Sequence, residues 1–359
     1  MENLPPSNRS TDAGLIARYG DYLPVPKSAQ WISLNEGSTP LVRLHTLCDP
    51  GRGIEVFAKV EGANPTGSFK DRGMTVALTM AVHDGSEAVI CASTGNTSAA
   101  AAAYAARAGI RAFVVIPDGK IALGKLAQAM MHGAKVIQIT GDFDDGMEIV
   151  KSMPTEAPVA LVNSVNPFRL HGQKTAAFEI IDTLGKAPDY HFLPVGNAGN
   201  ISAYWMGYTE YYEARKVNTR PAMVGCQAAG AAPFVSGRPV SNPETLATAI
   251  RIGNPQSWEL AQQAREASGG WFLASDDDAI LSAQKFLAHR EGIFCEPASA
   301  VSVAGLITAL GDESLEDGTT IVCTLTGQGL KDPDTAIAQS PEPVRVAPTL
   351  TAVRDSILD

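Results

Sequence analysis

Short apolar segments alternate with helix-forming segments along most of the chain, from about Ala88 to Leu325. The apolar segments have the length of strands, are rich in β-branched residues, and are bounded by Gly, Pro, Asp or Asn. They cover residues 88–92, 112–116, 136–139, 159–162, 190–195, 222–227 and 320–325. Because such strands separated by helices are typical of parallel sheets covered on both faces, the order predicts an α/β fold.

Three of the predicted helices, residues 97–108, 123–132 and 169–184, end directly before a glycine, which readily adopts the positive φ of a helix C-cap. A length of 359 residues suffices for two domains. We expect residues 87–161 to form a small inserted α/β domain, and residues 1–86 with 162–359 to form a larger one. Each would hold a mostly parallel twisted sheet flanked by helices. The Pro-rich segment 341–348 is expected to be a surface strap.

Composition excludes several classes of protein. A net charge of −10 argues against a nucleic-acid partner, which would require a basic face. No apolar run is long enough to cross a membrane, and the first ten residues do not have the pattern of a signal peptide. The five cysteines lie far apart and lack metal-ligand spacing, so we expect no metal site and a reduced, cytoplasmic enzyme.

A turn of glycine, proline and small polar residues presents Lys70 beside Phe69, just before a predicted helix at 73–82. A lysine that forms a Schiff base must reach an aldehyde and needs a lowered pKa, which a helix N-terminus or a nearby cation favours. Taken alone, a loop lysine is far more often a solvated charge.

Four further segments each follow a predicted strand. Residues 93–99 (Ser-Thr-Gly-Asn-Thr-Ser-Ala) and 196–200 (Gly-Asn-Ala-Gly-Asn) offer backbone N–H groups at a helix start, as anion sites do. Residues 324–329 (Thr-Leu-Thr-Gly-Gln-Gly) end the last strand, and residues 163–169 bring Arg169 to the start of a helix. Singly, each could be an ordinary helix cap or turn. Together they occupy the edge where parallel sheets bind ligands, and only the lysine loop follows no predicted strand.

This set of motifs resembles the tryptophan synthase-like, or type II, family of pyridoxal-phosphate enzymes, and within it the short bacterial threonine synthases. The resemblance covers residues 34–335. Its most specific parts are Glu-Gly-Ser-Thr-Pro-Leu at 36–41, Gly-Ser-Phe-Lys-Asp-Arg-Gly at 67–73, and Ala-Thr-Ala-Ile-Arg-Ile-Gly-Asn-Pro at 247–255. Related dehydratases usually lack the Asp-Arg-Gly continuation.

The resemblance implies a role for each motif residue. Lys70 would carry pyridoxal 5'-phosphate as a Schiff base and act as the base throughout. Asn96 would bind the cofactor's 3-hydroxyl, and Thr326 would face its pyridine nitrogen. The cofactor phosphate would lie against Gly196, Asn197, Ala198, Gly199 and Asn200.

The substrate implied is O-phospho-L-homoserine, which reacts with water to give L-threonine and phosphate. Its carboxylate would be bound by Ser93, Thr94, Asn96 and Thr97. Its phosphate would be bound by Thr97, Asn163, Ser164, Arg169 and Asn197. A homodimer is the family's usual assembly. The nearest alternative is a threonine or serine dehydratase, which needs no site for a substrate phosphate; a non-catalytic homologue that binds the cofactor is a second.

Overall fold

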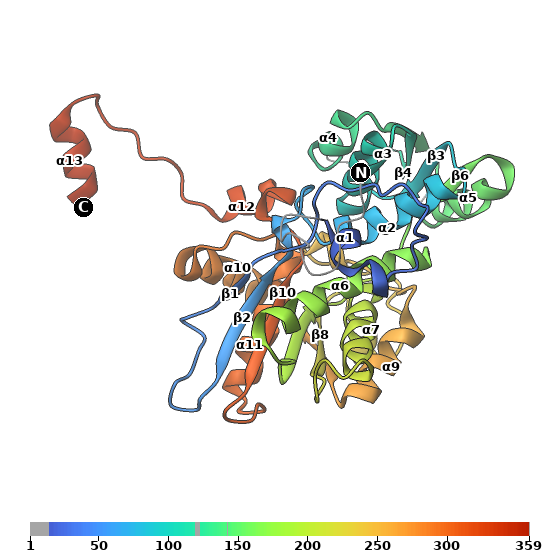
Figure 1. Ribbon diagram of the computed structural model, residues 1–359. Coiled ribbons are helices and arrows are strands. Elements are labelled where there is room, and N and C mark those ends of the chain that lie inside the picture. The colour runs from blue at the N-terminus through green and yellow to red at the C-terminus, as the bar shows by residue number, and fades with distance from the viewer. Residues whose placement is uncertain (1–13, 119–122, 142, 359) are drawn as a thin grey trace.

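The computed structural model describes residues 14–118, 123–141 and 143–358. Two sheets make up the fold, and helices lie on both faces of each (Figure 1). Among the described strands all neighbours pair in parallel except β1 with β2. The predicted α/β fold with two mostly parallel sheets is therefore confirmed. The N-terminal residues in which no signal peptide was expected lie outside the described residues.

The larger sheet has the strand order β1-β2-β10-β7-β8-β9, and the smaller has the order β5-β4-β3-β6. The bounds of the larger sheet are β1 (Leu41–Arg43), β2 (Glu55–Val60), β7 (Tyr190–Pro194), β8 (Ala222–Ala228), β9 (Trp271–Ser275) and β10 (Thr320–Leu325). Those of the smaller sheet are β3 (Ala88–Ala92), β4 (Arg111–Pro117), β5 (Lys135–Ile139) and β6 (Val159–Leu161). Because β10 adjoins β7, the segments that follow these two strands lie side by side. The same holds for the segments that follow β3 and β6.

All seven predicted strands are present, whereas β1, β2 and β9 were not predicted. β1 is only three residues long. Glu55 and Lys59 interrupt the apolar pattern of β2. β9 lies at the edge of its sheet and is half-exposed, so it lacks the continuous apolar character of a central strand.

The helices fill the intervals between strands, and the three predicted helix ends at Gly109, Gly133 and Gly185 have positive φ. The α-helices are α1 (Leu15–Tyr19), α2 (Lys70–His83), α3 (Asn96–Ala108), α4 (Leu123–Met131), α5 (Phe143–Glu156), α6 (Pro167–Leu184), α7 (Gly199–Glu213), α8 (Pro233–Ser236), α9 (Trp258–Ser268), α10 (Asp277–Glu291), α11 (Pro297–Gly311), α12 (Pro333–Gln339) and α13 (Leu350–Leu358). Short 3-10 turns are η2 (Gly20–Tyr22), η3 (Glu61–Ala63), η4 (Thr248–Ile250) and η5 (Gly329–Lys331).

Each sheet separates two apolar cores because alternate strand residues point to opposite faces. In β10, Ile321 and Cys323 belong to the core under α10 and α11, and Val322 to the core under α6 and α7. The smaller sheet divides likewise between α3 and α4 on one face and α5 on the other. Helix α2 contributes Met74 and Leu78 to the core of the smaller sheet, although it precedes residue 87. The proposed domain bounds remain a prediction.

The C-terminal segment leaves the body of the molecule after α12, and Figure 1 shows α13 held away from it. Residues 341–348 are exposed and extend away from the body (Figure 1), so they do not lie across its surface as the expected strap would. Within the described ranges no helix is both long and apolar enough to cross a membrane.

Candidate active site

The lysine loop lies against the turn that follows β10. Ser68 forms a bridge with Gly327, and the Phe69 N–H donates to the Thr326 carbonyl over 2.9 Å. The strand β2, parallel to β10, leads through η3 into this loop. The expectation that only the lysine loop follows no strand was therefore wrong, because β2 escaped prediction. Lys70 is also the first residue of α2, rather than preceding the helix.

The residues after Lys70 fix the loop. The Asp71 carboxylate accepts from the Thr66 hydroxyl at 2.7 Å, and burial raises the pKa of Asp71 to about 6. Arg72 is 1% exposed and donates to Glu61 and Glu179 at 2.7 Å each. These bonds join η3, α2 and α6 within one turn of Lys70, and so hold the lysine in place.

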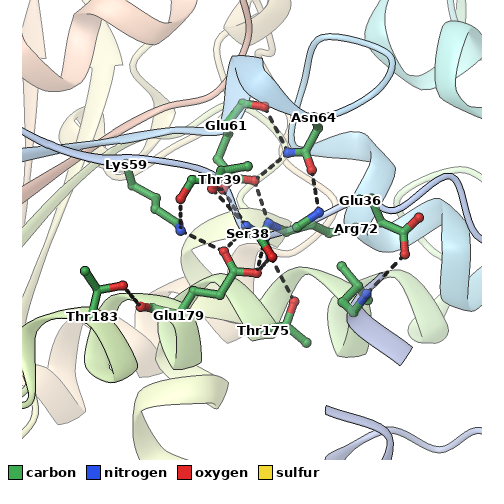
Figure 2. A network of polar contacts seen from close by, with 12 residues as sticks. Glu36, Ser38, Thr39, Lys59, Glu61, Asn64, Arg72, Thr175, Glu179 and Thr183 are labelled. Atoms are coloured by element: carbon green, nitrogen blue, oxygen red, sulfur yellow. Dashed lines mark hydrogen bonds and ion pairs between the residues drawn. The ribbon is translucent and has the colours of Figure 1, made fainter. Parts of the chain in front are cut away.

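Figure 2 shows that the Arg72 ion pairs belong to a larger buried network. The Lys59 Nζ lies 2.7 Å from Glu179, and the Ser38 N–H donates to the same carboxylate at 2.8 Å. Burial alone would raise the pKa of Glu179, but the charges of Arg72 and Lys59 outweigh it and lower that pKa. The segment at 36–41 thus contributes to the support of the lysine loop.

Two glycines allow α2 and α6 to pack closely. A β-carbon on Gly172 would lie 1.8 Å from the Arg72 carbonyl oxygen, and one on Gly73 would lie 3.1 Å from the Arg169 side chain. The first turn of α6 is therefore held against the first turn of α2, and Arg169 lies close to Lys70.

Arg169 is a buried cation that lacks an acidic partner within the described residues. It is 2% exposed, its Nη1 donates to the Val162 carbonyl at 3.2 Å, and its Nε has no hydrogen-bond partner. Burial lowers the pKa of Arg169 to about 10, which still leaves the guanidinium charged at pH 7. A buried charge of this kind is costly unless it binds an anion.

The Lys70 amine lies 3.8 Å from the centre of the Phe69 ring. Burial, and then the charge of Arg169, lower the pKa of Lys70 to about 7. About half of such amines are neutral at pH 7, as a nucleophile or base requires.

The segment after β3 begins α3 and is half-buried. Asn96 donates from Nδ2 to both oxygens of Glu296, at 3.0 and 3.2 Å. The N–H groups of the first helical turn point out of the helix start, beside Ser93, Thr94 and Thr97.

The side-chain amide of Asn163 is occupied by hydrogen bonds to the backbone. Its amide exchanges two hydrogen bonds with the backbone of Ala92, at 3.0 and 2.9 Å, and thereby ties the end of β6 to the end of β3. Ser164, one residue further, is half-buried.

The segment 196–200 has the conformation of an anion-binding turn. Ala198 adopts left-handed backbone angles (φ 65°) directly before α7. No hydrogen bond from its five backbone N–H groups to the described chain is found, and the buried Nδ2 of Asn200 has no partner. Gly196 fits against η4, because a β-carbon there would lie 3.0 Å from the Cα of Ile250. The segment at 247–255 thus supports this turn.

Thr326 is 5% exposed, and its hydroxyl lies 2.8 Å from the hydroxyl of Ser299 on α11. The structure therefore fixes the position of the Thr326 side chain. Within the described ranges no cluster of His, Cys, Asp and Glu side chains could hold a metal ion.

Contacts connect the predicted site residues from both sheets: the lysine loop with Thr326, α2 with Arg169, and Asn96 with α11. Sequence reasoning missed two further charged residues there, Glu296 and Lys331. The Lys331 Nζ donates to Gln128 at 2.5 Å, and its charge acts on Glu296. The only signal for Glu296 was an acid within the small apolar run Cys-Glu-Pro-Ala-Ser-Ala.

Comparison with known proteins agrees with this geometry. Residues 32–327 match the family described as "Pyridoxal-phosphate dependent enzyme". The threonine synthase of Mycobacterium tuberculosis is 59% identical over 338 residues, which are 93% of this chain and 94% of that protein. The threonine synthase of Synechocystis is 56% identical over 95% of this chain and 89% of its own length.

Solved structures share the fold at lower identity. Maize serine racemase has a TM-score of 0.71 at 21% identity, and covers 84% of this chain and 91% of its own. The processed form of threonine deaminase isoform 2 from Solanum lycopersicum has a TM-score of 0.69 at 20% identity, over 91% of this chain and 90% of its own.

The chain belongs to the pyridoxal-phosphate-dependent enzymes and, among them, to the threonine synthase family. The predicted family, cofactor and enzyme class are thereby confirmed.

Proposed function

We propose that this protein converts O-phospho-L-homoserine and water to L-threonine and phosphate, with Lys70 as the lysine that carries pyridoxal 5'-phosphate. The main support for a phosphorylated substrate is the environment of Arg169. This buried guanidinium lies beside Lys70 and has no acidic partner among the described residues. An anionic group on the substrate would satisfy it.

The residues present fit the cofactor. The open N–H groups of residues 196–200 and the unpaired Nδ2 of Asn200 suit its phosphate. Asn96 would bind the 3-hydroxyl, and Thr326 would face the pyridine nitrogen. When bound, the cofactor supplies the electron sink for charge that develops beside the amino group of the substrate. A threonine hydroxyl, unlike an aspartate, does not keep the pyridine nitrogen protonated, which favours elimination and replacement over transamination.

Lys70 moves the protons. Its amine, with a pKa of about 7, is neutral often enough to take the proton from Cα and then a proton from Cβ. The γ-phosphate then leaves, a proton is returned to Cγ, and water adds its hydroxyl at Cβ while a proton returns to Cα.

The remaining polar groups orient the substrate. Ser93, Thr94, Asn96 and Thr97, at the positive end of α3, would bind its carboxylate. Arg169, Ser164, Thr97 and Asn197 would bind its phosphate. Asn163, whose amide is bonded to Ala92, would act there chiefly by holding the two strand ends together.

A dehydratase of the same fold is the alternative, and Arg169 discriminates between the two. Replacement of Arg169 by alanine removes a charge-assisted hydrogen bond of about 1.5–3 kcal/mol. We expect kcat/KM for phosphohomoserine, measured by phosphate release and threonine formation, to fall roughly ten- to hundredfold. Cofactor attachment and slow deamination of serine should remain.

Replacement of the exposed Arg238 by alanine is the matched control and should change neither activity. If serine deamination falls together with phosphohomoserine turnover in Arg169→Ala, Arg169 is structural and the phosphorylated substrate loses its support.

We also propose a cytoplasmic homodimer with no nucleic-acid or membrane partner. All five cysteines are free, which suits a reducing compartment. Large apolar side chains are exposed on the C-terminal segment, among them Val344, Leu350 and Ile357 at 77%, 87% and 75%. Such exposure is typical of interfaces. Sedimentation should give twice the chain mass, and a monomer at micromolar concentration would contradict the proposal.

A further inference from the structure

Glu296 is an acid inside the site to which no role has been given. It precedes α11 at the N-cap position, but its side chain makes no capping hydrogen bond. It is 5% exposed, and a β-carbon on Gly327 would lie 2.6 Å from its Oε1. The carboxylate therefore lies between the turn after β10 and the start of α3.

Packing does not account for a charged side chain at this position. Among the ion pairs of the described residues none includes Glu296, and the side-chain hydrogen bonds found for it are those from Asn96. Burial raises the pKa of Glu296, which is the expected cost of removing a carboxylate from water. Buried acids with such unfavourable surroundings are concentrated at functional sites.

The carboxylate selects one orientation of the Asn96 amide. An ionised carboxylate can only accept hydrogen bonds, so the NH2 group of Asn96 must point to it. The Oδ1 of Asn96 is then fixed relative to the lysine loop. The bond also joins α3 of the smaller sheet to α11 of the larger sheet, so it fixes Asn96 across the two halves of the site.

We propose that Glu296 is a positioning residue for the threonine synthase reaction: it orients Asn96 toward the cofactor and places a negative charge beside Lys70. The inference rests on the proposed function and adds to it a residue that acts through another.

The negative charge of Glu296 should shift the titration of the bound cofactor in a direction that can be predicted. The titratable groups around Glu296 are Lys70 on α2, Lys331 at the end of η5, Asp332 after it, and the neighbouring Cys295. A negative charge near the Lys70 nitrogen favours its protonated form in the linkage to the cofactor. Removal of that charge must therefore lower the pH at which the visible absorption of the bound cofactor titrates.

The test compares Glu296→Gln with Glu259→Gln, an equal change of charge at an exposed position of α9. Glutamine keeps the shape of the side chain but can donate as well as accept, so the Asn96 orientation is no longer selected. In Glu296→Gln we expect the cofactor's dissociation constant to rise about tenfold. The spectroscopic midpoint should move down by about one pH unit. The kcat of Glu296→Gln should fall while its KM changes little. Glu259→Gln should behave as the unmodified protein.

An Asn96→Ala background shows whether Glu296 acts through Asn96. The two substitutions should then be non-additive, so that Glu296→Gln weakens cofactor binding much less than it does alone. If Glu296→Gln fails to fold, Glu296→Asp takes its place: it keeps the charge and hence the midpoint, but its shorter side chain should lose the Asn96 contact and weaken cofactor binding.

The inference would be overturned if Glu296→Gln kept the midpoint of the unmodified protein and bound the cofactor as tightly as Glu259→Gln does. Full additivity with Asn96→Ala would also overturn it. Failure of the proposed function has a different signature, namely that the unmodified protein forms no threonine from phosphohomoserine. The spectroscopic comparison remains decisive in that case, because it needs only the bound cofactor.

Discussion

At the scale of single residues, the lysine of the site is defined by its surroundings. Several lysines are buried or half-buried, but Lys59 is bound to Glu179 and Lys331 to Gln128. Lys70 instead lies over the Phe69 ring, and burial, followed by the charge of Arg169, lowers its pKa to about 7. The sequence motif predicted this lysine, whereas its lowered pKa comes mainly from burial in the folded chain, with a smaller contribution from Arg169, 99 positions later.

The rate at which added cofactor attaches to the apo-protein should follow the neutral fraction of the Lys70 amine. Because the pKa is lowered, the rate should rise with pH through about 7 and then level off, whereas a free lysine would continue to gain neutral amine up to about 10.4. Stopped-flow absorbance measures the rate, and borohydride reduction followed by mass spectrometry identifies the lysine. A midpoint near 10 would contradict the lowered pKa of Lys70, and a label on Lys59 or Lys331 would show that Lys70 is not the attachment site.

At the scale of elements, the site depends on close approaches that only glycine permits. Gly172 and Gly73 bring α6 against α2, and Gly196 brings the turn after β7 against η4. The sequence suggested an anion site at 196–200 from its two glycines and its position between a predicted strand and a helix. It did not reveal that Ile250 packs on Gly196, because that contact joins segments more than fifty residues apart.

Replacement of Gly196 by alanine should weaken cofactor binding. The added β-carbon would lie 3.0 Å from the Ile250 backbone, which can yield only if the turn moves. Overpacking of this kind costs about 1–3 kcal/mol. If the turn moves, the cofactor dissociation constant should therefore be roughly five- to 150-fold higher. Equilibrium titration of the apo-protein measures it.

Gly311, at the end of α11, offers the control, since nothing lies within 4 Å of a β-carbon there. Its replacement by alanine should leave cofactor affinity unchanged. Equal affinity in the two variants would mean that the turn at 196–200 does not hold the cofactor.

At the scale of the whole molecule, the candidate site lies between the two sheets, and side-chain hydrogen bonds cross from one to the other. Asn96 bonds to Glu296, and Gln128 bonds to both Lys331 and the Thr66 carbonyl. The segment proposed to bind the substrate carboxylate belongs to the smaller sheet, and the turn at 196–200 belongs to the larger. A substrate that touches both would therefore draw the halves together.

We expect a non-hydrolysable phosphonate analogue of the substrate to reduce the radius of gyration of the holoenzyme in X-ray scattering. The same analogue should have less effect on Arg169→Ala, which lacks one of the proposed phosphate ligands. Superimposable profiles with and without saturating analogue would indicate a preformed site.

The sequence by itself determined the fold class, because alternating apolar and helical segments can be buried only as parallel sheets covered by helices. It also determined the family and the site motifs, since each motif is continuous along the chain. Only the tertiary structure decided what surrounds them. The bonds of Arg72 to Glu179, of the Asn163 amide to Ala92, and of Asn96 to Glu296 all join positions far apart in the chain. No periodicity in the chain encodes such contacts, because they arise only when two sheets and their helices pack around one site.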